Sequence, residues 1–176
     1  MKLKYAYGFV AAQVYRLLHV FPNSDPLMGF ILPAAKNESA WKAPLFAFSS
    51  MFLFDIITRQ LGIWTYVTSA TYAFIALLFT QLLKNREASL KTYTGTGLAG
   101  IIAFDFITGP VMSTVLFSQS FILTTIMQIP FTIMHLVSTA FAIVIITPLL
   151  DAQVAKEMNA IFSHAKSTLH TRRIQS

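Results

Sequence analysis

Six apolar segments, separated by short polar connections, make up most of this chain. They cover residues 5–21, 27–35, 43–58, 64–83, 93–117 and 121–149. A helix needs roughly 20 predominantly apolar residues to cross the hydrocarbon core of a bilayer. The pattern therefore predicts an all-α integral membrane protein, a compact bundle of about six transmembrane helices. The second helix, over about residues 26–35, is the shortest, so it is extended by its flanks, packs inside the bundle, or is re-entrant.

The last part of the chain has a different pattern. An apolar stripe at helical spacing is opposed by basic residues. The stripe consists of Val154, Met158, Ile161, Phe162, Ala165 and Leu169, and the basic side chains are Lys156, His164, Lys166, Arg172 and Arg173. We therefore divide the chain into a transmembrane bundle (residues 1–151) and a cytoplasmic, amphipathic, basic tail (residues 152–176). The tail should lie on the membrane surface or on a partner protein.

Composition agrees with the hydropathy pattern. Hydrophobic residues make up 55% of the chain and charged residues 11%, and the mean hydropathy is +0.62, whereas soluble domains average about 25% charged residues. The absence of cysteine excludes disulfides and thiolate metal sites. A net charge of +6 in a membrane protein reflects basic cytoplasmic loops rather than a nucleic-acid partner.

Loop charges predict the orientation. If all six segments cross the bilayer, eleven lysines and arginines lie on one side and only Arg16 and Arg59 on the other. Basic loops stay in the cytoplasm, so both termini would be cytoplasmic in a multi-pass protein of the cell membrane. If the second segment does not cross, the split becomes ten to three and the orientation reverses.

Two similar patterns place acidic residues in apolar segments. Phe-Asp-Ile-Ile-Thr at 54–58 is echoed by Phe-Asp-Phe-Ile-Thr at 104–108, which runs into a Gly-Pro pair expected to interrupt the helix. Asp55 and Arg59 are four residues apart, so they share a helix face and can pair. A charge in mid-bilayer costs at least ~2.5 kcal/mol and usually faces a partner or a cavity. The two carboxylates, Asp55 and Asp105, are therefore the strongest functional signal.

With six spans, both acidic patterns lie in the outer half of the membrane. We expect an outward-facing pocket that binds a small solute, closed by the loop from Asn23 to Asp25. Its other side chains would be Asp55, Arg59, Trp64, Tyr72, Asp105, Gln128 and His135. Gln128 and His135 belong to a polar stripe on the last span, which either hydrogen-bonds to other helices or lines a cavity. The alternative is a structural Asp55–Arg59 pair, with Asp105 capping a broken helix.

The layout of the chain resembles a known family of membrane proteins. Six short helices, small residues Gly8 and Ala12 on the first helix, the Pro22-Asn23 turn and an outward polar pocket are similar to the substrate-binding S component of energy-coupling factor (ECF) transporters. The resemblance covers residues 5–151 and rests on size, hydropathy layout and the neighbourhoods of 23–33 and 52–64. It implies that a vitamin-like small molecule is captured outside, and that a transmembrane T component and ATPase subunits drive its release inside. The family's alanine-rich docking motif would map to Gly8 and Ala12.

Two other functional classes remain as alternatives. The chain has no Walker lysine motif and no His-Glu-x-x-His, and its four histidines are scattered, so we expect no ATPase activity, no metal and no cofactor. Asp55 and Asp105 would form an intramembrane aspartyl dyad only if they shared a proton, and Arg59 would oppose this by favouring ionisation of Asp55. In a solitary proton-coupled carrier, Asp105 and His135 would relay protons.

Overall fold

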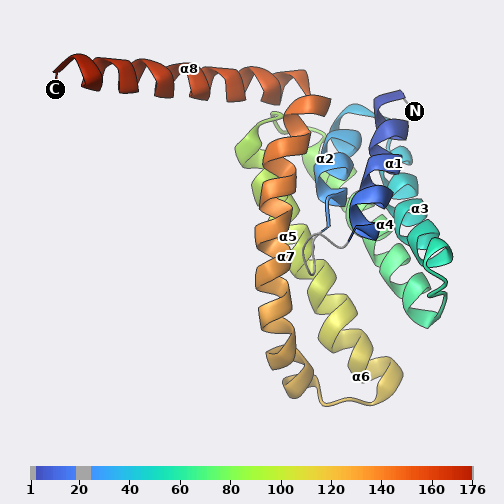
Figure 1. Ribbon diagram of the computed structural model, residues 1–176. Coiled ribbons are helices and arrows are strands. Elements are labelled where there is room, and N and C mark those ends of the chain that lie inside the picture. The colour runs from blue at the N-terminus through green and yellow to red at the C-terminus, as the bar shows by residue number, and fades with distance from the viewer. Residues whose placement is uncertain (1–2, 19–24, 176) are drawn as a thin grey trace.

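The computed structural model describes the backbone of residues 3–18 and 25–175, and side chains as far as residue 166. Every regular element in this part of the chain is helical (Figure 1). The elements are α1 (Leu3–Leu17), α2 (Leu27–Asn37), α3 (Lys42–Ile57), α4 (Ile63–Leu83), α5 (Leu90–Phe106), the π-helix η1 (Ile107–Val111), α6 (Met112–Phe117), α7 (Phe121–Leu150) and α8 (Ala152–Gln175).

Three helices in the described part of the chain are long and apolar enough to cross a membrane. They are α4, the continuous helix formed by α5, η1 and α6, and α7. This supports the prediction of a helical membrane protein. The helices α1, α2 and α3 have 15, 11 and 16 residues, fewer than the roughly 20 that a full crossing needs.

The short helix α2 lies inside the bundle, where it contacts α3, α4 and α7. Nine of its eleven residues are buried. At 1.5 Å per residue it is about 16 Å long, about half of the hydrocarbon core. A close approach to α7 occurs at Gly29, where a Cβ atom would lie 2.8 Å from the Ala142 carbonyl oxygen. Of the three alternatives for this segment, packing inside the bundle is the one observed.

The expected interruption at Gly109-Pro110 takes the form of a π-helical segment, Ile107–Val111, which separates α5 from α6 without ending the helix as a whole. Proline lacks an N–H and its ring collides with the carbonyl four residues earlier in a regular α-helix. The wider π turn accommodates the ring, so the helix continues through the proline.

Local sequence explains the turn before α7. Ser118 adopts the left-handed conformation (φ 53°), which ends α6. The Ser120 hydroxyl accepts a hydrogen bond from the Leu123 N–H at 3.5 Å, so it caps the first turn of α7. The short polar connection predicted between the apolar segments 93–117 and 121–149 is thus confirmed.

Basic side chains hold helix ends together at one end of the bundle. The Lys4 ammonium donates a hydrogen bond to the Leu150 carbonyl at the end of α7. The Lys36 ammonium donates to the Leu83 carbonyl at the end of α4, at 2.9 Å. The start of α1 and the end of α2 therefore lie at the same end, as Figure 1 shows. The ten-to-three charge split, which would place Lys4 and Lys36 on opposite sides, is wrong.

Asp151 connects the bundle to α8 at that end. One of its carboxylate oxygens accepts hydrogen bonds from Asn37 Nδ2 and the Tyr93 hydroxyl, each at 2.7 Å, and the other accepts from the Gln153 and Val154 N–H groups. Burial alone would raise the pKa of Asp151, but these four donors favour the ionised form and together lower it below its ordinary value. The carboxylate is thus held charged, and it caps α8.

Candidate functional site

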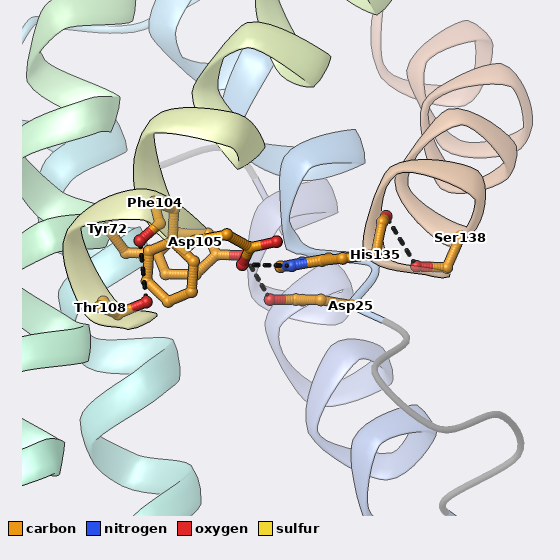
Figure 2. A network of polar contacts seen from close by, with 7 residues as sticks. All are labelled: Asp25, Tyr72, Phe104, Asp105, Thr108, His135 and Ser138. Atoms are coloured by element: carbon orange, nitrogen blue, oxygen red, sulfur yellow. Dashed lines mark hydrogen bonds and ion pairs between the residues drawn. The ribbon is translucent and has the colours of Figure 1, made fainter. Parts of the chain in front are cut away.

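A buried acid–base pair lies between α5 and α7. Asp105 Oδ1 and His135 Nδ1 are 3.0 Å apart, and the two residues are only 4% and 6% exposed. Both helices position them: Asp105 is next to the end of α5, and His135 is on the face of α7 that packs against α5 (Figure 2). The sequence predicted both residues as site residues, and the fold brings them into contact.

Each member of this pair keeps one buried polar atom without a hydrogen-bond partner in the described part of the chain. The atoms are Asp105 Oδ2 and His135 Nε2. Buried polar atoms are usually hydrogen-bonded, and an unsatisfied one costs about 1–3 kcal/mol. When Nδ1 donates its proton to the carboxylate, Nε2 of a neutral imidazole is an acceptor. In this tautomer, the pair offers two acceptors to a group that carries hydrogen-bond donors.

A second hydrogen-bonded pair, Tyr72 and Asp25, lies close to the first. The Tyr72 hydroxyl, on α4, donates a hydrogen bond to Asp25 Oδ2 at 2.6 Å. Asp25 Oδ1 accepts from the Leu27 N–H at 2.8 Å and so caps the start of α2. Tyr72 is 1% exposed, so its hydroxyl is committed to this bond. The two residues were predicted for the same site by sequence.

Phe104 connects the two pairs. Its ring centroid is 4.3 Å from that of Tyr72, and it meets the His135 ring edge-on with centroids 6.1 Å apart. Figure 2 shows the three rings and both carboxylates gathered in one region between the helices. Asp25, Tyr72, Phe104, Asp105 and His135 are hereafter called the polar network. Phe104 was not predicted, although its place in the repeated Phe-Asp pattern was the signal that could have found it.

Asp55 and Arg59 do not belong to the polar network, and they do not pair. Asp105 forms its ion pair with His135, and no ion pair joins Asp55 to Arg59, although the structure describes both residues. The helix α3 ends at Ile57, and Arg59 is exposed in a left-handed conformation (φ 58°). An i, i+4 pair needs a continuous helix, so the predicted pairing is wrong. The aspartyl dyad is not formed either, since Asp105 pairs with His135.

Other predicted site residues lie elsewhere. Trp64 packs against Phe117 at the end of α6, with ring centroids 5.6 Å apart. Gln128 lies against Gly109 of the π-helix. Asn23 is outside the described residues. Instead of the single pocket expected from sequence, the structure brings together the smaller polar network, whose residues come from α4, α5, α7 and the start of α2.

The small residues Gly8 and Ala12 of α1 are buried within the chain. A Cβ atom at Gly8 would collide with the Phe30 ring of α2, and Ala12 is 1% exposed. Small residues let membrane helices approach closely, and here the helices belong to the same chain. The docking role mapped onto Gly8 and Ala12 is therefore wrong for this arrangement, since Phe30 covers Gly8 and Ala12 has almost no exposed surface to offer a partner.

A cavity of about 920 Å³ reaches one residue of the polar network, Asp25. It lies between α1, the start of α2 and α7, and most of its lining is apolar. Its lining residues with polar side-chain atoms are Tyr15, Asp25 and Ser138, and Ser138 donates a hydrogen bond to the His135 carbonyl. Ligand sites typically combine apolar walls with a few placed polar groups. Of the predicted residues that the structure describes, Asp25 and Ala12 line this cavity.

Arg16 is a further charged residue inside the bundle. Its guanidinium lies over the Phe54 ring, 3.9 Å from the centroid, and donates to the Ser50 carbonyl at 3.3 Å. A cation over an aromatic face is stabilised by the ring quadrupole. Arg16 thus faces α3 within the protein.

Comparison of the chain with protein-family models, curated proteins and solved structures finds no match. Among the described residues, no group of three or more histidine, aspartate or glutamate side chains is placed to hold a metal ion. Evidence for function therefore comes from the geometry of the polar network.

Proposed function

We propose that the protein captures a small polar or heterocyclic solute, such as a vitamin, from outside the cell and is the substrate-binding S component of an ECF-type importer. The observation that supports this most directly is the pair of buried, unpartnered atoms Asp105 Oδ2 and His135 Nε2. A helical membrane protein gains nothing in stability from such atoms, because each costs free energy when unsatisfied. A bound solute with donor groups would satisfy both.

The depth of the pair supports binding within the membrane. His135 precedes Asp151 by 16 residues on α7, which is about 24 Å at 1.5 Å per residue. A bilayer core is about 30 Å thick. If Asp151 lies at the cytoplasmic headgroups, the pair is inside the core and nearer the outer surface. Intramembrane ionisable residues at such depth usually mark a solute or ion pathway.

The chemistry of the network defines the solute that it would recognise. Asp105 presents its unpartnered carboxylate oxygen to a donor or cationic group, and the rings of Tyr72 and Phe104 pack together beside it. A compact heterocycle with an amine or ring N–H suits both features. Release inside would be driven by a transmembrane T component with ATPase subunits. These would contact a face of α1 other than that of Gly8 and Ala12.

Mass spectrometry of small molecules released from the purified protein tests the proposal. We expect one compound in stoichiometric amount from the wild type, and its loss from Asp105→Asn, because the amide replaces one acceptor with a donor. The matched control is Asp55→Asn, which changes a carboxylate outside the network and should keep the compound. A wild-type protein that releases no compound, from cells grown in rich medium, contradicts the proposal.

The 3.0 Å contact between Asp105 and His135 favours a second candidate, a solitary proton-coupled carrier. Such a pair can pass a proton between a carboxylate and an imidazole. Purified protein in liposomes, with no ATPase, distinguishes the two candidates. Uptake of the released compound driven by an imposed pH gradient supports the carrier. Binding without uptake supports the S component.

A further inference from the structure

The apolar stripe of α8 is covered only in its first two turns. Val154 is completely buried against the bundle, and Met158 packs against the same core. Glu157 accepts a hydrogen bond from the Leu90 N–H at 2.7 Å, which attaches this part of α8 to the start of α5. The covered side of α8 therefore faces the bundle, that is, toward the interior of the membrane.

The same stripe continues beyond the edge of the bundle. Ile161 and Phe162 are 52% and 64% exposed, and Ala165 is also exposed. With 3.6 residues per turn, these residues lie on the same side of the helix as Val154 and Met158. They therefore face the same direction, but no part of the described chain covers them.

The junction with α7 determines the direction of α8. Asp151 is extended (φ −125°, ψ 116°) and breaks the helix between Leu150 and Ala152. As Figure 1 shows, α8 then runs sideways from the end of α7 and extends beyond the bundle, on the side away from α1, α3 and α4. Because α7 is long enough to cross the membrane, a helix leaving its end in this direction runs along the membrane surface.

We infer that α8 beyond Met158 is an in-plane membrane anchor, whose apolar side enters the bilayer interface and whose basic residues bind anionic lipid headgroups. Lys156 and Lys166 are exposed, and the tail from residue 152 also contains Arg172 and Arg173, with Glu157 as its one acidic residue. The resulting net charge is 4 − 1 = +3. Basic segments are attracted to anionic leaflets, and an apolar stripe adds buried area.

This inference does not depend on solute binding. A membrane anchor would, however, set the depth of the polar network in the bilayer. An anchor in the headgroup layer fixes the depth of Asp151 and of the basic end of the bundle. The Asp105–His135 pair then lies at a fixed distance from the cytoplasmic surface, because α7 is one continuous helix.

The chain contains no cysteine, so a single spin label can be placed without background. We would label Ile161→Cys and Ser163→Cys in the full-length protein. Both positions are exposed, and neither belongs to the packed core. They differ in direction: Ser163 lies on the side of α8 opposite the stripe. The protein is reconstituted in nanodiscs with anionic lipid, and accessibility to oxygen and to a water-soluble nickel chelate is measured by electron paramagnetic resonance.

In anionic nanodiscs we expect the label at 161 to lose accessibility to the nickel chelate and to remain accessible to oxygen, while the label at 163 stays accessible to the chelate. The difference in chelate accessibility between the two labels should be smaller in purely zwitterionic nanodiscs. Equal accessibility of both positions to the chelate would overturn the inference and leave this side of α8 for a protein partner. Shielding of 161 from both reagents would also overturn it, because a protein contact would then cover the stripe.

Discussion

Asp25 and Asp105 obtain different partners although both lie in the polar network. Asp25 binds a tyrosine hydroxyl and a backbone N–H, so both of its oxygens are satisfied. Asp105 binds His135 through one oxygen and leaves the other unpartnered in the described structure. Asp25 is therefore suited to hold α2 and α4 together, and Asp105 is suited to bind a solute.

The hydrogen bond between Tyr72 and Asp25 should contribute measurably to stability. Tyr72→Phe removes the donor and keeps the ring next to Phe104, so we expect a loss of about 1–2 kcal/mol in the free energy of unfolding. Reversible unfolding of the purified protein in mixed micelles measures it. Tyr66→Phe is the control, since Tyr66 is 60% exposed, and it should change stability little. Equal effects of both substitutions would contradict the role assigned to the bond.

Asp151 should make stability depend on acidic pH. Because folding lowers its pKa, its contribution is complete above the pKa of the unfolded chain and is lost as the pH falls through the folded value. Asp151→Asn keeps a capping side chain but not the charge. We expect the variant to be less stable than the wild type at pH 7, by about 1–3 kcal/mol, and the difference to shrink as the pH falls below 3.8, the ordinary aspartate value.

Thermal unfolding of both proteins across this range measures the effect of Asp151. The comparison isolates one carboxylate, because the other acidic groups titrate in both proteins. A difference that stays constant from neutral to acidic pH would show that the charge of Asp151 is unimportant.

At the scale of the helices, close approach determines where α2 can sit. Its burial between α3, α4 and α7 requires a residue without a side chain at Gly29, which faces the backbone of α7. Hydrophobic driving forces between helices are weak in lipid, so packing at such contacts contributes much of the stability. The position of α2 in turn places Asp25 next to Tyr72.

Two glycine substitutions test the contact between α2 and α7. Gly29→Ala should destabilise the protein by about 1–3 kcal/mol, because the added methyl group would meet the Ala142 carbonyl. Gly95→Ala, on α5, has no atom within 4 Å of the added group and should be neutral or stabilise by up to about 1 kcal/mol. Unfolding in mixed micelles compares them. A neutral effect at Gly29 would show that α2 can move away from α7.

At the scale of the whole molecule, the basic residues gather at the end of the bundle from which α8 emerges. Contacts of Lys4 with the end of α7 and of Lys36 with the end of α4 bring this arrangement about. The basic residues lie at this end whether α1 and α2 each cross the bilayer or together enter it and return to the same side. Both cases place the two ends of the chain on one side.

Labelling of single cysteines in vesicles of known orientation tests this topology. Asn85→Cys lies in the connection between α4 and α5, and Gln119→Cys lies in the turn between α6 and α7. One continuous helix over 90–117 separates them. A membrane-impermeant thiol reagent should therefore label them from opposite sides, with Asn85 cytoplasmic. Labelling of both from the same side would contradict the crossing.

The sequence alone determined the all-helical membrane class, the positions of most helices and four members of the polar network. Hydropathy and helical period are local properties, so they can be read along the chain. The tertiary structure decided the rest. Asp55 and Arg59 were predicted to pair, but the end of α3 separates them. Gly8 and Ala12 were predicted to face a partner, but Phe30 of α2 covers Gly8 and Ala12 is buried. Contacts between distant helices depend on packing of the whole bundle, which spacing along the chain does not specify.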